Sequence, residues 1–585
     1  MTLHEWLSHY TNLYQSHAEP SFSPCSSAPS KLAAKLTAPF SLSELRLNLK
    51  KQKSKAKSTN SISPVDLKTL SSSLSKPLLI IFNSILRQEI DFPSSWLNSY
   101  FFFLYKKGPP SDPSNYRSLA IEDPFLKVFM SLLTDRLTDY AEDANILPKL
   151  QFGFRKNHSA PAAISILKKI IKNSFLSKRK LYTCFIDFRK AFDLVDRTIL
   201  FQKLLSMGVP SSFCEVLFNI YKNLSFRIKS NDSLSDPFLT YNGVIQGDPL
   251  SPLLFSLYIS DMVESFTHEG ITIQDHHFNY LLYADDLVIF SNDPHELQSA
   301  LNNLSIYCKK NKLSLNTQKT KCLPFYKGGH KPTIIFEYDN IKLENTNTFE
   351  YLGVTMTTQS KSSKHIDKII TKCNSRVGQL FSKIPLPEVS LQIAMSVFNC
   401  YILPVLTYAI PVWLPETALT QENKLNSLQT KFLKRWLGVP YCTDNSVVYK
   451  LCNYTPLFNQ LQIISKNRFL NLSFPKSLNG FKLDPPAYSH SSTIVSLPDY
   501  FTSSPVDLKG PLPHNTFARR ALLYDALDLL HSHLCETKKF HKHVDEDCLC
   551  KYCHQPADDH HRHSCSSLKD LTSSAVYKLL MNPPS

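Results

Sequence analysis

The sequence predicts an α+β fold, in which helices and strands follow one another in irregular order. Over residues 78–356, apolar segments of strand length and amphipathic segments of helix length are separated by turn residues. These segments do not alternate regularly, so a mixed arrangement is favoured over a doubly wound sheet. The chain also contains no GxGxxG or GxxxxGK[ST] string, which argues against dinucleotide-binding and P-loop folds.

The elements of this region follow from periodicity and turn signals. Helices are predicted where apolar residues recur every three to four positions, and strands where short aromatic or β-branched runs end at turns. The predicted helices cover residues 77–89, 162–172, 197–207 and 212–223, and the predicted strands cover residues 100–106, 181–188 and 225–229.

The chain of 585 residues has room for roughly three or four domains. Residues 1–77 are rich in Ser, Lys and Pro, include the basic run 50–57, and are expected to be partly disordered. Residues 78–356 hold the mixed elements, residues 357–480 are mostly helical, and residues 481–585 combine a Pro/Ser-rich linker with a short Cys/His module. In the helical region, helices are predicted over residues 366–384, 389–403 and 420–437.

The composition limits the partners and the compartment. A formal net charge of +16 favours a polyanionic partner, either nucleic acid or an anionic membrane surface. No apolar run approaches the roughly 18 residues of a membrane span, and the N-terminal segment lacks a signal peptide's features. The 14 cysteines are mostly scattered singly, so we expect reduced thiols in an intracellular protein.

The string Tyr283-Ala284-Asp285-Asp286 is the first candidate site. Apolar runs of strand length precede and follow it, which predicts a β-hairpin with two acids at its tip. Two uncompensated carboxylates beside buried strands repel each other, and a divalent cation would neutralise them. A polar turn without a metal is the simpler alternative, because Asp is a common turn residue.

A third carboxylate, Asp187, follows an apolar strand and is expected to face this hairpin if the strands are neighbours. Three converging carboxylates suit Mg²⁺, or Mn²⁺, together with water and phosphate oxygens. Two such ions would activate an attacking hydroxyl and stabilise the departing pyrophosphate in phosphoryl transfer.

Between these acids lies the string 243–255, Gly-Val-Ile-Gln-Gly-Asp-Pro-Leu-Ser-Pro-Leu-Leu-Phe. It has two glycines within five residues of a chain with only 13, which predicts a backbone that a ligand can approach closely. Its prolines, Pro249 and Pro252, suit the first turn of a helix. An ordinary loop that enters a helix is the alternative.

Together these motifs resemble the reverse transcriptases of non-LTR retrotransposons, the LINE and jockey-like group. The resemblance rests on Asp187 with its Lys-Ala-Phe-Asp continuation, on residues 243–255, and on Tyr-Ala-Asp-Asp. It extends over about residues 40–356, and residues 434–440 also resemble the family beyond the palm. Further matching motifs are Lys106-Lys107-Gly108 with Asn115-Tyr116-Arg117, Gln151-Phe152-Gly153-Phe154-Arg155, Leu313-Ser314-Leu315-Asn316 with Lys319-Thr320-Lys321, and Phe349-Glu350-Tyr351-Leu352-Gly353.

This resemblance implies a right-hand polymerase fold, with fingers and palm in residues 78–356, preceded by a finger extension, and a helical thumb after them. It implies an RNA-directed DNA polymerase that extends a DNA 3′ end on an RNA template, using dNTPs and two Mg²⁺ or Mn²⁺ ions. The expected partners are therefore the RNA template, the DNA primer or target, and dNTPs, without a membrane. The resemblance also implies a chain that begins in the linker before the fingers and lacks the endonuclease of complete elements.

By the same resemblance, individual residues receive roles. Asp187, Asp285 and Asp286 would bind the metal ions, and Lys319 would give a proton to the pyrophosphate. Phe192 would be the steric gate that excludes a 2′-hydroxyl. The remaining expected nucleotide contacts are Lys107, Arg117, the backbone of Phe188, Gln246 and Gly247, and the expected primer grip is Tyr351, Leu352 and Gly353.

The sequence departs from the family near the N terminus and in the finger motifs. Lys57 stands where the family commonly has Pro in Lys-Ala-Pro-Gly, and Ser118 stands where it has Pro in Arg-Pro-Ile. These positions lie outside the three acids, so they argue for weakened template handling rather than lost chemistry. Two other classes compete: a decayed or domesticated nucleic-acid-binding protein with this fold, and an RNA-dependent RNA polymerase, which predicts a small residue at position 192.

The C-terminal module contains four N/S ligands, Cys550, Cys553, His560 and Cys565, at compact spacing. Such a set suits a tetrahedral structural Zn²⁺, as in a zinc knuckle. The third ligand is ambiguous, because His561 and His563 are close enough to replace His560, and Cys548 could replace the first ligand. A His-rich tail with adventitious metal affinity is the alternative.

Overall fold

The computed structural model describes residues 2–486, apart from 16–17, 25–29, 54–61, 231–232, 387–388, 440, 442 and 444. The chain divides into two compact units. The first contains Met1–Ser360 together with Ser473–Leu483, and the second contains Lys361–Leu472 and the segment from Asp484 onward. The sequence had placed this division between residues 356 and 357. The Cys/His module lies outside the described residues.

The first unit contains a sheet with the strand order β2-β1-β4-β5, in which β6 also pairs with β4. Strands β1 and β2 form an antiparallel hairpin, whereas β1 and β4 run parallel, with Phe101 opposite Ile228. Parallel pairing requires a long crossover, which here includes the whole segment between the two strands. The strands are β1 (Asn98–Tyr105), β2 (Tyr116–Ile121), β4 (Ser225–Ser230), β5 (Ser233–Leu234) and β6 (Phe238–Leu239).

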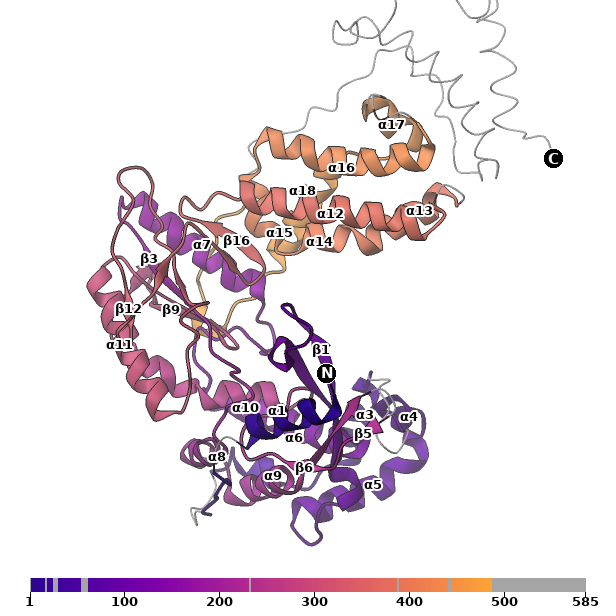
Figure 1. The fold of residues 1–585 in the computed structure, drawn as a ribbon, viewed down its shortest axis with the longest axis vertical. Helices are drawn as coiled ribbons and strands as arrows, with labels where there is room; N and C mark the ends of the chain where they lie inside the picture. Colours follow the sequence, from indigo (N-terminus) through magenta and orange to yellow (C-terminus); the bar gives the residue numbers. More distant parts are fainter. Residues whose placement is uncertain are drawn as a thin grey trace, which may run out of the picture. The chain divides into compact units, whose positions relative to one another are not determined.

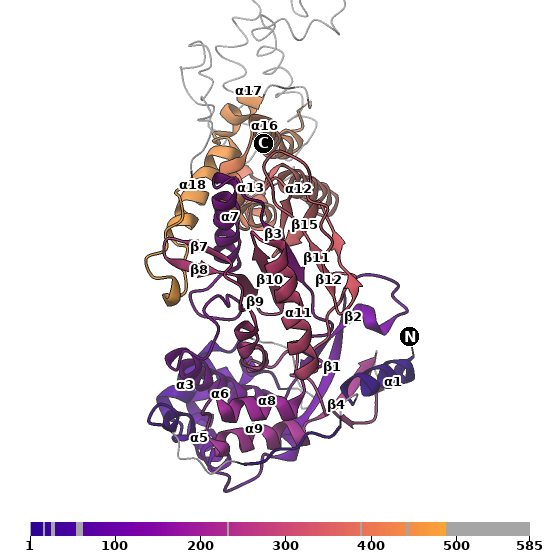
Figure 2. The same ribbon diagram turned by 90° about the vertical axis from the view of Figure 1, so that its left-hand side faces the viewer.

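A second sheet of the same unit has the order β14-β11-β3-β10-β9. All five residues of β3 are buried, as expected for a central strand. Helix α7 (Ala160–Leu176) packs against β9, and helix α11 (Pro294–Lys310) packs against β3 and β10 (Figure 2). The strands are β3 (Tyr182–Ile186), β9 (Tyr280–Tyr283), β10 (Asp286–Ser291), β11 (Lys321–Cys322) and β14 (Glu344–Asn345).

The seven elements predicted in this unit are confirmed with small shifts. The largest shift is at α5, which begins at Ser71 and includes Pro77, although the sequence placed Pro77 at its start. The prediction assumed that proline marks the first turn, where its missing N–H costs nothing. Helix α5 spans Ser71–Leu86, and the helices that follow in this unit include α6 (Pro124–Asp143), α8 (Arg197–Ser206), α9 (Ser211–Asn223) and α10 (Ser251–Tyr258). Short hairpins complete it, with strands β7 (Ile271–Ile273), β8 (His276–Phe278), β12 (Glu337–Tyr338), β13 (Ile341–Lys342), β15 (Thr348–Tyr351) and β16 (Val354–Thr357).

The N-terminal region contains four helices that the sequence analysis did not predict. Capping boxes begin three of them: Thr2 with Glu5 in α1, Ser41 with Glu44 in α3, and Ser63 with Asp66 in α4. Glu44 also receives two hydrogen bonds from Arg136 of α6, at 2.8 and 3.0 Å, which ties α3 to the larger fold. The helices are α1 (Leu3–Tyr14), α2 (Ala34–Thr37), α3 (Leu42–Lys51) and α4 (Pro64–Thr69).

The second unit is a helical domain in its described part (Figure 1). Its core includes the two fully buried tryptophans Trp413 and Trp436, packed with Phe398 and Phe432. The three helices predicted here are confirmed as α12, α13 and α16. The helices are α12 (Ser363–Lys383), α13 (Leu391–Tyr401), α14 (Leu403–Thr407), α15 (Ile410–Trp413), α16 (Leu419–Leu437), α17 (Asn445–Cys452) and α18 (Leu457–Leu470). Within the described residues, no helix is both long and apolar enough to cross a membrane.

Candidate active site

The two sequence-adjacent acids lie at the turn of a hairpin, as the sequence predicted. Strands β9 and β10 pair antiparallel with Tyr283 opposite Asp286, and Ala284 has a left-handed φ of 57° in the turn. Strand β3 is the other neighbour of β10, with Ile186 opposite Leu287. Asp187 directly follows Ile186, so the three carboxylates lie at the same edge of the sheet.

The negative charges of these acids repel one another. Burial raises the pKa of Asp285, and the negative charge of Asp187 raises it further. The Asp286 side chain is reached by solvent, yet desolvation by crowded neighbours, followed by Asp285 and Asp187, raises its pKa to about 6. Within the described residues, no three His, Cys, Asp or Glu side chains form a ready-made metal cluster. The donor chemistry nevertheless fits a hard cation, because oxygen ligands that repel each other gain most from its charge.

The backbone of Asp187 is fixed by the segment after α11. Its N–H donates to Thr320 Oγ1 at 3.2 Å, and its carbonyl accepts from the Asn316 N–H at 2.8 Å. Lys319 Nζ lies 3.8 Å from Asp187 Oδ2. The lysine side chain is largely exposed, so this ion pair adds little to stability. It does place a cation beside the acids.

Gln151 holds the acidic turn, and the sequence analysis assigned it no role. Its Oε1 accepts hydrogen bonds from the N–H groups of Ala284, at 2.9 Å, and Gly153, at 2.8 Å. Its Nε2 donates to the Ala284 carbonyl at 3.4 Å. A Cβ at Gly153 would collide with the Ala284 nitrogen, so glycine permits this close approach. The sequence signal for this role was a polar amide, Gln151, among the apolar residues of segment 150–154.

Phe192 lies in a small aromatic group. Its ring stacks on Phe255 of α10, with centroids 4.7 Å apart, and meets the exposed Phe154 edge-on at 6.5 Å. Its carbonyl accepts a hydrogen bond from Val244 N–H at 2.8 Å. The ring is half-buried and is therefore held from behind while part of it remains accessible.

Gln246 and Gly247 are fixed against β2 and against Asp193. The Gln246 carbonyl accepts from Ala120 N–H at 2.6 Å, and its Nε2 donates to Asp193 Oδ1 at 2.7 Å. Gly247 has a φ of 119°, and a Cβ there would lie 2.6 Å from the Ala120 carbonyl oxygen. The loop therefore has one defined path beside Phe192.

The basic residues of the β1–β2 hairpin include one to which the sequence interpretation gave no role. Lys106, Lys107 and Arg117 are all exposed. The neighbouring Lys106 is in electrostatic contact with the site: loss of hydration lowers its pKa, Arg117 lowers it further, and Asp193 opposes this shift. Both Lys106 and Arg117 also lower the pKa of Asp285, against its burial. Lys106 is thus a cation of this site that the sequence analysis missed.

The remaining predicted residues lie around β3. Phe188 is buried and forms an isolated bridge with Leu315. Tyr351 is buried too, with its ring 5.4 Å from that of Phe185, and burial followed by the charge of Asp286 raises its pKa. Leu352 and Gly353 form the β15–β16 turn, with φ values of 46° and 79°. The turn is accessible to solvent, whereas the Tyr351 ring is buried.

A pair of buried carboxyl groups joins the end of β2 to the loop before α10. Glu122 is 4% exposed, and neither of its carboxylate oxygens has a hydrogen-bond partner among the described residues. Burial, followed by the charge of Asp248, raises the pKa of Glu122, and burial raises the pKa of Asp248 to about 7. Asp248 accepts from the Leu250 N–H at 3.2 Å, near the start of α10. The pair is therefore favoured in a protonated form.

We predict that this pair makes the protein less stable as the pH rises. In the unfolded chain both groups ionise at about pH 4. Below that pH both states hold the protons, whereas at higher pH the unfolded state releases them first, so the free energy of unfolding falls until the folded groups ionise, near the raised pKa of Asp248. We expect a loss on the order of a few kcal/mol between about pH 4 and pH 7, measured as a fall in Tm.

The variant Glu122→Gln tests this prediction, because it removes one ionisable group and keeps the side-chain shape. Its absolute Tm can change, so the measured quantity is the slope of Tm with pH, which should be smaller than in the unsubstituted protein. Glu269→Gln changes an exposed acid and is the control, with an unchanged slope. Equal slopes for all three proteins would contradict the prediction.

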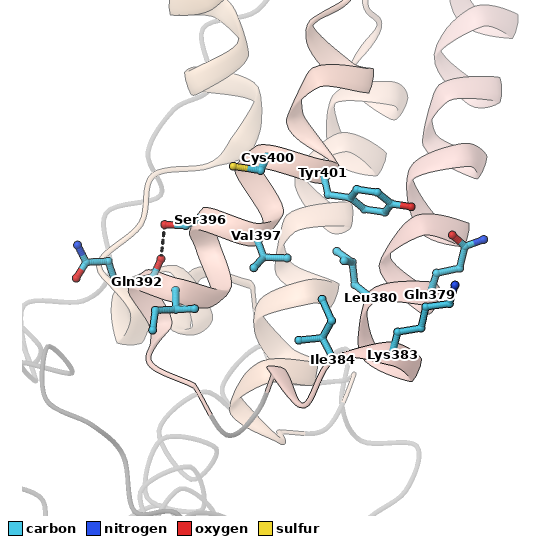
Figure 3. A pocket seen from close by; sticks show the side chains of 10 residues that line it. Gln379, Leu380, Lys383, Ile384, Gln392, Ser396, Val397, Cys400 and Tyr401 are labelled. Carbon is cyan, nitrogen blue, oxygen red and sulfur yellow. Dashed lines mark hydrogen bonds between the residues drawn. The ribbon is translucent and has the colours of Figure 1, made fainter. Parts of the chain in front are cut away.

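A hollow lies in the helical unit, between α12 and α13 (Figure 3). Its volume is about 740 Å³. The lining is mainly apolar, and its residues are Gln379, Leu380, Lys383, Ile384, Gln392, Ile393, Ser396, Val397, Cys400 and Tyr401. Because none of these is acidic, the hollow cannot hold the hard cation that the hairpin acids fit.

The fold and the acidic hairpin agree with a match to a known family. Residues 104–356 match the family described as "Reverse transcriptase (RNA-dependent DNA polymerase)". This part of the chain is therefore similar to reverse transcriptase domains, and its mixed helices and strands are consistent with a polymerase fold.

The relatives of the chain include polymerases of mobile elements. The chain is 28% identical to the "Probable RNA-directed DNA polymerase from transposon BS" of Drosophila melanogaster, over 66% of this chain and 43% of the relative. It is 26% identical to the "RNA-directed DNA polymerase from mobile element jockey" of Drosophila funebris, over 62% and 40%. These matches support a reverse transcriptase of the non-LTR retrotransposon type, as the sequence predicted. The matched part spans less than half the length of these relatives.

Proposed function

We propose that this chain is an RNA-directed DNA polymerase, which extends a DNA 3′ end on an RNA template with dNTPs. The observation that carries the proposal is the convergence of Asp187, Asp285 and Asp286 at one edge of a sheet inside a reverse transcriptase domain. Two Mg²⁺ or Mn²⁺ ions bound there would supply the positive charge that phosphoryl transfer requires.

The chain's own groups would bind and orient the nucleotide. Arg117 and Lys106, with Lys107 beside them, would bind the triphosphate, because cations stabilise the charge that develops during transfer. Gln246 would support the nucleotide beside the template base, with Phe192 under its sugar. Lys319, which lies beside Asp187, would hold the proton that the leaving pyrophosphate accepts.

The helical unit would act as the thumb. Basic side chains repeat along the exposed side of α12, at spacings that keep them on one helix face. Such a row of cations suits a nucleic-acid backbone, and its binding would weaken as salt rises. The residues of this row are the exposed Lys364, Lys372 and Lys383, with the half-buried Arg376, which donates to the Tyr401 carbonyl at 3.0 Å.

Primer extension tests the proposal. We expect the full chain, with Mg²⁺, to extend a DNA primer on an RNA template and to use dNTPs rather than rNTPs. A reaction without template is the control, and the product length should follow the template. Nucleic-acid binding without incorporation would overturn the polymerase and favour the binding protein with this fold. Preferred use of rNTPs would favour an RNA polymerase.

A further inference from the structure

Helix α1 packs on the sheet that contains β1 through stacked aromatic rings. Trp6 stacks on Phe103 of β1 with ring centroids 4.1 Å apart, and Tyr14 stacks on Phe101 at 5.4 Å. Tyr10, between them along the helix, stacks on Phe103 at 4.7 Å. Each of these rings of α1 is at most 7% exposed. The helix is therefore packed as part of the folded unit.

The last residue of this helix, Tyr14, contacts Asp193 and the segment just before residues 243–255. The Tyr14 hydroxyl donates to Asp193 Oδ1 at 3.0 Å and lies 2.9 Å from Ser118 Oγ of β2. The Tyr14 carbonyl accepts from the N–H groups of Tyr241, at 2.8 Å, and Asn242, at 3.2 Å. Tyr14 is thus bound through both its side chain and its backbone to the segment that leads into residues 243–255.

Asp193 connects Tyr14 to Gln246. It directly follows Phe192, is buried, and receives two hydrogen bonds on the same oxygen, from Tyr14 and, at 2.7 Å, from Gln246 Nε2. A carboxylate only accepts hydrogen bonds, so it orients the Gln246 amide with its nitrogen toward Asp193. Burial raises the pKa of Asp193, and the hydrogen bonds from Tyr14 and Gln246 lower it. The charged acceptor therefore depends on the hydroxyl of Tyr14.

We propose that Tyr14 is a positioning residue of the nucleotide site: through Asp193 it fixes the side chain of Gln246 and so sets the affinity for the incoming dNTP. This inference rests on the proposed function, which assigns Gln246 to the nucleotide. It makes helix α1 part of the polymerase site, although α1 lies far from the motifs in sequence.

The chain offers a matched control. Tyr10 is on the same helix and in the same aromatic stack, and loss of its hydroxyl removes a similar group from a similar place. In the described part of the chain, the side-chain hydrogen bonds to the Asp193 carboxylate come from Tyr14 and Gln246, not from Tyr10. A purely structural role of the stack would therefore make Tyr10→Phe and Tyr14→Phe alike.

The experiment measures KM for dNTP and kcat in primer extension on an RNA template. We expect Tyr14→Phe to raise KM about tenfold, since a hydrogen bond to a charged group is lost, with a smaller change in kcat. Tyr10→Phe should change KM less than about twofold. In a Gln246→Ala background, Tyr14→Phe should raise KM by less than about a further twofold, because the effects of coupled residues are not additive.

Two outcomes would overturn the inference while the polymerase stands: an unchanged KM in Tyr14→Phe, or the same fold-change in the Gln246→Ala background. Similar melting curves for Tyr10→Phe and Tyr14→Phe would confirm that both variants fold. If the unsubstituted chain incorporates no dNTP, the proposed function itself fails. The two failures are therefore distinguishable.

Discussion

Asp285→Asn is expected to lower dNTP incorporation by about a thousandfold or more. The substitution keeps the size of the side chain but removes one of three carboxylates at the sheet edge. The remaining charge of Asp187 and Asp286 would bind divalent cations more weakly and stabilise less of the charge in the transition state. The measurement is single-nucleotide primer extension at saturating dNTP and Mg²⁺.

In Asp285→Asn, a loss of activity can be distinguished from a loss of folding. Burial and the charge of Asp187 raise the pKa of Asp285, so a neutral Asn relieves an unfavourable charge. Asp285→Asn should therefore melt at the same temperature as the unsubstituted protein or above it. Asp275→Asn is the control, because it makes the same change at an exposed acid in the β7–β8 turn, away from the three carboxylates. Retention of more than about a tenth of the activity in Asp285→Asn would contradict its role as a metal ligand.

Local patterns were sufficient to predict the strands and the acidic turn. Buried strands such as β3 and β10 appear in the sequence as apolar runs, and an acid next to such a run is expected at the end of the strand. The pairing of β3 with β10 then brings Asp187 beside Asp286 without further information. The position of the three acids is thus nearly a consequence of hydrophobic periodicity.

The supporting contacts could not be predicted in this way, because they join segments far apart. Gln151 bonds to Ala284 across 133 positions, and Tyr14 bonds to Asp193 across 179. No periodicity relates such pairs, and only the tertiary fold brings them together. Within α1, however, Trp6, Tyr10 and Tyr14 recur every four residues, which marks one helix face. That signal was available in a region whose Ser, Lys and Pro content suggested disorder.

Side-chain direction explains the position of Tyr351. The sequence analysis assigned Tyr351 to the primer grip, and its side chain points from its strand into the core, beside Phe185. Successive residues of a strand point to opposite faces, so a motif alone does not show which of its side chains is exposed. Lys106 received no role from the sequence, yet it lowers the pKa of Asp285 together with the predicted Arg117.

Phe192→Val is expected to relax the choice between dNTP and rNTP by about a hundredfold, chiefly through faster rNTP use. The Phe192 ring stacks on Phe255 at 4.7 Å and touches Phe154, so it cannot turn away from a 2′-hydroxyl without disturbing both rings. Valine is shorter and leaves the space that the hydroxyl needs. The measurement is the ratio of kcat/KM for dNTP and rNTP with the same base.

Phe255→Val is the matched comparison, because it removes the ring behind the gate and leaves the gate in place. If Phe192 excludes the hydroxyl by its own bulk, Phe255→Val should give a smaller loss of discrimination, since the freed ring can retreat only partly. An equal preference in the Phe192→Val variant and the unsubstituted protein would remove the gate assignment. Equal losses in both variants would instead show that rigidity, and not the size of residue 192, excludes the ribonucleotide. The pair of substitutions therefore separates the shape of the gate from the packing that holds it.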